Sequence, residues 1–212
     1  RVWDPATGLF TLTPATFGDL HCAGQSILAD GRVIVVGGVL GAPHDGTNIT
    51  ALFDPVSQTW TRGQDMTDLR WYATSTTLAD GRVLATSGDA PDGTRSEIPE
   101  VYDPVTDTWT RLTTAQRSQG LYPFMFVLPD GRVYEAGSKS ATAYLEPSGT
   151  GSWTDGPSAG FSTSGYSESA VMYRPGRIMR AGGGDPAVAR TTVIDLTAAS
   201  PAWRTVAPMQ FA

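Results

Sequence analysis

The sequence predicts an all-β fold built from repeated four-stranded units, and three recurring markers carry the prediction. The first is a turn glycine, usually within Asp-Gly-Arg, that recurs every 45 to 50 residues at Gly31, Gly81, Gly131 and Gly176. The second is an aromatic or apolar residue followed by an acid and usually a proline, and the third is an aromatic residue a few positions later. Repeats of this length are typical of stacked β-units.

The second and third markers complete each unit. The second stands at Trp3-Asp4-Pro5, Phe53-Asp54-Pro55, Tyr102-Asp103-Pro104, Leu145-Glu146-Pro147 and Ile194-Asp195, and the third at Phe10, Trp60, Trp109, Trp153 and Trp203. Because the tryptophans recur at the period of the unit, we expect them to pack between neighbouring units as scaffold.

The strands of the first complete unit follow from its turn residues. Asp30-Gly31 accepts the positive φ of a tight hairpin turn, so strands are expected on both sides of it. Gly37-Gly38 ends the second strand and Pro55 ends the third. The predicted strands are 25–29, 32–36, 49–53 and 59–62.

Units of this kind are typical of kelch-type β-propeller blades. The predicted blades are residues 19–66, 67–114, 115–157 and 158–209, and residues 1–18 form the end of a preceding blade. Residues 1–212 are then one partial propeller domain, an open arc of a seven-bladed ring. Since an open arc leaves strand edges unpaired, we expect the remaining blades to come from further sequence or from another chain.

Composition and charge exclude several classes of protein. The net charge is −6 and Lys139 is the single lysine, which disfavours nucleic acid as a partner. The longest apolar stretch, residues 33–42, is shorter than the roughly 20 residues that a membrane span needs. Residues 1–5 already belong to the repeat, so no signal peptide is recognised and a mature or truncated product is expected.

Cys22, the single cysteine, occupies a special place in the repeat. Counting nine residues back from each turn glycine gives Cys22, Tyr72, Tyr122 and Ser167. In a propeller the first strand of each blade lines the central channel, so we expect these residues to form a ring, with Cys22 beside Tyr72. The alternative is that Cys22 is a small buried apolar residue of the core.

These residues resemble a known family. The segments His21-Cys22-Ala23-Gly24 and Leu69-Arg70-Trp71-Tyr72 are similar to those of the galactose oxidase and glyoxal oxidase group of copper-radical oxidases. The resemblance implies that Tyr72 is an equatorial copper ligand and that a thioether joins it to Cys22 to form the radical cofactor. A thioether beside the phenol oxygen lowers its oxidation potential, and copper stabilises a phenolate that is otherwise rare near neutral pH.

The resemblance also implies an activity. Such a protein oxidises a primary alcohol, an aldehyde or a carbohydrate with dioxygen, forms hydrogen peroxide and is secreted. The family's axial Tyr-His pair and its second copper histidine do not occur in this sequence, so the chain alone is expected to be inactive. Residues 87–100 lack the tryptophan that covers the thioether in galactose oxidase, and Trp71 is expected to point away from Tyr72 on a shared strand.

Other side chains are candidates for contact with substrate. His44 stands in a loop between the second and third strands, Arg70 precedes Tyr72, and Tyr122 shares the predicted ring. Each has a structural alternative: a surface loop for His44, a channel-lining aromatic for Tyr122, and binding of main-chain carbonyls for Arg70 and for Arg117 at the corresponding place.

A second function remains open from the sequence. A noncatalytic kelch propeller that binds a protein or a glycan, or that builds an extracellular assembly, fits the same repeat. It is favoured by the missing copper histidines and Tyr-His pair.

Overall fold

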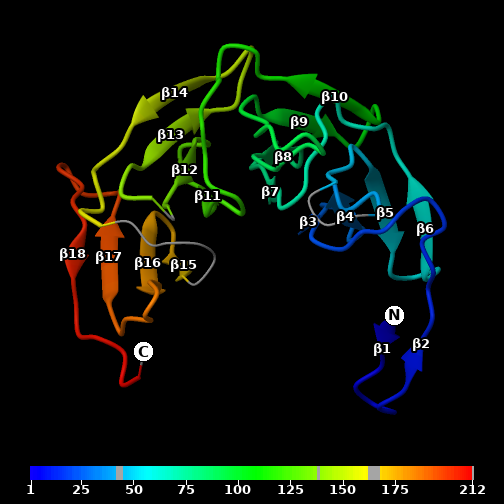
Figure 1. Ribbon diagram of the computed structural model, residues 1–212, viewed down its shortest axis with the longest axis horizontal. Coiled ribbons are helices and arrows are strands. Elements are labelled where there is room, and N and C mark those ends of the chain that lie inside the picture. The colour runs from blue at the N-terminus through cyan, green and yellow to red at the C-terminus, as the bar shows by residue number, and fades with distance from the viewer. Residues whose placement is uncertain (42–44, 138, 162–167, 212) are drawn as a thin grey trace. The chain divides into compact units, whose positions relative to one another are not determined.

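The computed structural model describes residues 1–41, 45–137, 139–161 and 168–211. Every regular element within these residues is a β-strand, and the strands form four four-stranded antiparallel sheets and one two-stranded hairpin (Figure 1). The prediction of an all-β fold built from four-stranded blades is confirmed. The chain divides into two compact units, residues 1–111 and 112–212.

The first unit contains the hairpin and two sheets. The hairpin pairs β1 (Val2–Trp3) with β2 (Phe10–Thr11). The next sheet has the order β3 (Gly24–Ile27), β4 (Val33–Val36), β5 (Thr50–Asp54) and β6 (Thr59–Arg62). The last has the order β7 (Thr74–Thr77), β8 (Val83–Thr86), β9 (Glu100–Asp103) and β10 (Thr108–Arg111).

The second unit contains the other two sheets, with strands again in chain order. One consists of β11 (Met125–Val127), β12 (Val133–Glu135), β13 (Ala143–Glu146) and β14 (Ser152–Asp155). The other consists of β15 (Glu168–Arg174), β16 (Arg177–Gly182), β17 (Thr191–Asp195) and β18 (Arg204–Thr205). The assignment of the whole chain to a single partial propeller domain, and the blade boundaries, stay predictions.

The Asp-Gly-Arg turns close the first hairpin of a sheet by the same contacts each time. Gly31 has φ of 88°, which glycine adopts without steric cost. The Asp30 carboxylate accepts hydrogen bonds from the Arg32 backbone N–H at 3.0 Å and from its Nε–H at 2.8 Å. These bonds hold the pKa of Asp30 below its ordinary value. The repeat of this tripeptide therefore fixes the hairpin that follows each blade start.

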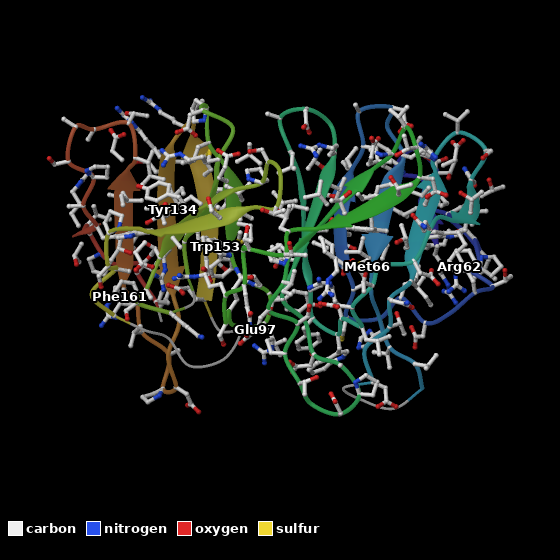
Figure 2. All side chains as sticks on the ribbon, turned by 90° about the horizontal axis from the view of Figure 1, so that it is seen from above. Arg62, Met66, Glu97, Tyr134, Trp153 and Phe161 are labelled. Carbon is white, nitrogen blue, oxygen red and sulfur yellow. The ribbon has the colours of Figure 1, made fainter. Side chains whose placement is uncertain are left out.

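The cores lie between the sheets of each unit. In the first unit the buried core takes side chains from both sheets, including Ile34 and Val83, and Met66 from the connection between the sheets (Figure 2). In the second unit Tyr134 of β12 and Ile178 of β16 belong to the buried core. Burial raises the pKa of Tyr134 to about 12, so its phenol stays neutral and can accept and donate hydrogen bonds.

Within the first unit, the tryptophans of β6 and β10 contact the chain that precedes their own sheet. The indole N–H of Trp60 donates to the Thr13 carbonyl at 2.8 Å. That of Trp109 donates to the Gln64 carbonyl and to the Thr50 hydroxyl, both at 2.9 Å. These acceptors belong to the preceding blade or its trailing chain. The prediction that the tryptophans are interblade scaffold agrees with these contacts.

Trp109→Phe is expected to lower the free energy of unfolding by about 1 to 3 kcal/mol, because it removes the donor to the Thr50 hydroxyl, in a part-buried hydrogen bond, and to the Gln64 carbonyl. Equilibrium unfolding in urea measures the change. Val105→Ala is the control: this side chain is 91% exposed, and its loss should change stability by less than about 0.5 kcal/mol. Equal effects of the two substitutions would contradict the assigned role of Trp109.

Candidate functional site

Three residues at the starts of blades share an unusual backbone conformation. Cys22, Tyr72 and Tyr122 have φ of 61°, 63° and 46°. Each stands in a turn just before β3, β7 or β11, so the prediction that they lie on the first strands is wrong. A left-handed residue cannot continue a β-ladder. It costs about 1 to 3 kcal/mol in a non-glycine residue and is found preferentially at functional sites. Ser167, the fourth member of the predicted ring, lies outside the described residues.

Cys22 and Tyr72 are in direct backbone contact. The Tyr72 N–H donates to the Cys22 carbonyl with an N···O distance of 3.0 Å. The strands that follow keep this alignment, since the hydroxyls of Ser26 on β3 and Ser75 on β7 are 2.8 Å apart. Both side chains are half-buried. The structure therefore brings together the two residues that the sequence assigns to a cofactor.

Trp71 stacks on Tyr72. The ring centroids are 3.6 Å apart and the ring planes are inclined by 13°. The prediction that Trp71 points away from Tyr72 is wrong, because it assumed a continuous strand through both residues, whereas the left-handed backbone of Tyr72 breaks the alternation of side chains. Trp71 is 7% exposed, so its indole covers one face of the phenol and keeps water from that face.

A ladder of isolated β-bridges holds the segment that precedes Tyr72. On one side the Arg70 N–H donates to the Thr47 carbonyl at 2.8 Å. On the other side the N–H and carbonyl of Trp71 exchange two hydrogen bonds of 2.8 Å with Asp89. The full ladder runs from Asp19 to Val39, from Val39 to Gly46, from Thr47 to Arg70, from Trp71 to Asp89 and from Asp89 to Arg95. It fixes the backbone from which both rings project.

Arg70 is fully buried and serves the fold. Its guanidinium donates to the carbonyls of Ser87 and Ile98 at 2.8 and 2.7 Å and to the Glu100 carboxylate at 3.0 Å. Both side chains of the Arg70–Glu100 pair are 0% exposed. Burial lowers the pKa of Arg70, and the Glu100 carboxylate opposes this shift. The alternative role of binding main-chain carbonyls fits Arg70, while contact with substrate is excluded by its burial.

The remaining predicted residues have different outcomes. Arg117 pairs with the carboxylates of Glu135 and Asp155 at 3.0 and 3.2 Å. Carbonyl binding was therefore the wrong prediction for this residue. His44 lies outside the described residues. Tyr122 belongs to the second compact unit, and its role in substrate contact stays a prediction.

Copper fits the site only in part. Tyr72 offers a phenol oxygen, a hard donor suited to an oxidised copper ion, and Cys22 stands beside it for the thioether. Among the described residues no group of three or more His, Cys, Asp or Glu side chains is placed to hold a metal ion. The described residues thus supply the tyrosine and cysteine of the predicted centre, and they do not complete a copper coordination shell.

The loop after β8 was missed as part of this site. Asp89 is bridged to Trp71 and pairs with Arg95. Its Asp, Pro and Gly residues are typical of exposed turns, so the local sequence does not mark it as part of a site. The signal for its role is the tertiary bridge to Trp71, which no local pattern records.

The chain is similar in sequence to known oxidases. No family model matches it. It is 31% identical over 163 residues to two sequences of galactose oxidase from Gibberella zeae, across 70% of this chain and 23% of each relative. It is 25% identical over 144 residues to the putative aldehyde oxidase Art an 7 of Artemisia annua, across 62% of this chain and 24% of that protein. The aligned part is thus less than a quarter of the length of these curated relatives.

A solved structure supports the fold. A fungal alcohol oxidase of the AA5 family, determined in complex with copper, superposes with a TM-score of 0.83 at 24% identity and covers 99% of this chain and 47% of its own. Within the described residues, no helix is long and apolar enough to span a membrane.

Arg70→Met is expected to lower the free energy of unfolding by about 3 to 5 kcal/mol, because it leaves the Glu100 carboxylate buried without its cation. The double substitution with Glu100→Gln should recover part of the loss. Chemical denaturation measures both. Arg82→Met removes an ion pair whose side chains are 37% and 51% exposed, so about 1 kcal/mol or less is expected. A loss in Arg70→Met no larger than this control would contradict a structural role for the buried pair.

Proposed function

The chain belongs to the galactose oxidase-like family of copper-radical oxidases, and from this premise we propose that Cys22 and Tyr72 form the thioether cofactor of such an oxidase. The observation that carries the proposal is the hydrogen bond of 3.0 Å between the Tyr72 N–H and the Cys22 carbonyl, which joins two left-handed residues at the same level of neighbouring blades. This contact supports a covalent bond between the side chains because it holds their backbones side by side.

Formation of the cofactor is an oxidation. The Cys22 Sγ bonds to a ring carbon of Tyr72 next to the phenol oxygen. The thiol hydrogen and the ring hydrogen leave as two protons with two electrons. Dioxygen accepts them and becomes hydrogen peroxide, with copper required to promote the reaction. The product is a phenol that is easier to oxidise than free tyrosine, since the sulfur donates electron density to the ring.

Tyr72 would hold the copper ion through its phenolate oxygen. When bound, copper together with the oxidised Tyr72 ring supplies the means to take two electrons and two protons from a primary alcohol, giving an aldehyde, and to pass them to dioxygen, giving hydrogen peroxide. Trp71 protects the cofactor by covering one face of the phenol at 3.6 Å. The bridge ladder keeps Trp71 and Tyr72 in register.

The other copper ligands and the substrate are also part of the proposal. The described residues complete no metal cluster, so further ligands would come from elsewhere in the complete protein or from another chain that supplies the remaining blades. The proposed substrate is a primary alcohol, an aldehyde or a carbohydrate, and the proposed location is extracellular. Tyr122 and His44 remain candidates for substrate contact, whereas Arg70 is withdrawn because it is buried.

In the complete protein, exposure to copper and dioxygen should join the peptides that carry Cys22 and Tyr72, with a loss of two hydrogen atoms. Peptide mass spectrometry after treatment with an alkylating agent measures the cross-link, and the Cys22 thiol should no longer react. Cys22→Ser and Tyr72→Phe should each abolish the cross-link and the formation of hydrogen peroxide from primary alcohols.

Tyr122→Phe is the matched control, because Tyr122 has the same backbone conformation but follows a blade that carries Tyr72 in place of a cysteine. The cross-link should persist in this variant. A Cys22 that still alkylates completely in the copper-treated protein would overturn the proposal and would favour the noncatalytic binding module.

A further inference from the structure

The loop that follows β8 folds back on itself as a small hairpin. Within it, the Ala90 N–H donates to the Thr94 carbonyl and the Ser96 N–H to the Gly88 carbonyl, both at 2.9 Å. Asp89 forms an ion pair with Arg95 through both carboxylate oxygens. The Asp89 side chain is 13% exposed and that of Arg95 is 29% exposed. This pair therefore closes the loop in a partly desolvated position, where it is screened less than a surface pair.

The same loop is attached to Trp71 on its other side. The two hydrogen bonds of 2.8 Å between Trp71 and Asp89 make Asp89 the link between the loop and the blade start. Gly46 packs against this link so tightly that a Cβ atom there would lie 2.1 Å from the Asp89 carbonyl oxygen and 2.7 Å from the Trp71 nitrogen. The Asp89 backbone thus has little room to move toward the first blade.

We propose that the Asp89–Arg95 ion pair positions Trp71 so that its indole lies flat on Tyr72. The contacts form one continuous path: Arg95 holds the Asp89 side chain, the Asp89 backbone holds that of Trp71, and Trp71 stacks on Tyr72. Asp89 and Arg95 are positioning residues, since they act through Trp71. That the stack protects a redox-active ring rests on the proposed function; the positioning itself is independent of it.

Backbone hydrogen bonds of Ala90 and Ser96 hold the loop, and the Asp89–Arg95 ion pair adds a side-chain restraint between its two sides. The bridge between Asp89 and Arg95 is the last of the series of isolated bridges, and no strand continues it. Loss of the Asp89 carboxylate would leave a partly buried guanidinium without this partner and would release the two sides of the loop. The loop would then fluctuate, and Trp71 would leave its stacked orientation for part of the time.

The test measures the stack in the metal-free protein. Trp71 and Tyr72 in near-parallel contact should contribute to the near-ultraviolet circular dichroism, and the contribution is identified as the signal lost in both Trp71→Phe and Tyr72→Phe. Asp89→Asn and Arg95→Gln should lose most of that signal while the far-ultraviolet spectrum of the β-sheets is unchanged. Arg95→Lys, which keeps the charge, should retain more of it than Arg95→Gln.

Arg82→Gln is the matched control, because it breaks the Asp80–Arg82 ion pair of the same blade without contact to Trp71. It should leave the signal of the stack intact. The exchanged pair, Asp89→Arg with Arg95→Asp, should restore part of the signal lost in the single variants. An unchanged signal in Asp89→Asn and Arg95→Gln would overturn the proposal, as would a stack signal that is absent from the unsubstituted protein.

A second measurement separates this inference from the proposed function. In the copper-treated complete protein, the cross-link between Cys22 and Tyr72 reports the cofactor, whereas the circular dichroism of the metal-free protein reports the positioning. Loss of the stack signal in Asp89→Asn without any cross-link in the unsubstituted protein would support the positioning role and reject the cofactor. A normal cross-link in the unsubstituted protein, with no change of the stack signal in the variants, would support the cofactor and reject the positioning role.

Discussion

The chain has to leave the β conformation at Tyr72 before it enters β7, and the contacts around this residue depend on that turn. With φ of 63°, Tyr72 directs its N–H to the Cys22 carbonyl and lets its ring lie against Trp71. An extended backbone would place the two side chains on opposite faces of a strand. The strain of the left-handed residue is thus compensated by an interblade hydrogen bond and by an aromatic stack.

The buried Arg70–Glu100 pair holds the backbone just before this turn, because Arg70 precedes Tyr72 by two residues. A fully desolvated arginine is unfavourable unless its charge is paired, and here two carbonyls and a carboxylate accept hydrogen bonds from the two terminal nitrogens of the guanidinium. A hydrophobic side chain of similar volume could fill the space, but it could not bind the carbonyls of Ser87 and Ile98, which belong to the loop after β8. Arg70 therefore links the blade start to the loop that carries Asp89, and the ion pair has a geometric role beyond its contribution to stability.

The sequence predicts the repeated strands well because their signals are local. An Asp-Gly-Arg turn and a proline after an acid fix strand ends within a few residues, and the constant offset of Cys22 and Tyr72 predicts their alignment. The left-handed backbone at these two positions has no such signal, since neither is a glycine or an asparagine. The stack of Trp71 was missed for this reason. The burial of Arg70 depends on a glutamate 30 residues away, so no local pattern could distinguish a structural arginine from a substrate contact.

The shared conformation of Cys22, Tyr72 and Tyr122 indicates how a structural repeat can carry reactive side chains at equivalent positions. The scaffold imposes the same left-handed turn on each of these blade starts, whatever the side chain. The chemistry available at each blade start then depends on which side chain stands there, because the backbone geometry is the same. A cysteine followed one blade later by a tyrosine provides a thiol beside a phenol, whereas the next blade start carries Tyr122 and no second cysteine. The repeat thus explains why a thioether is proposed at one pair of blade starts and not at the following pair.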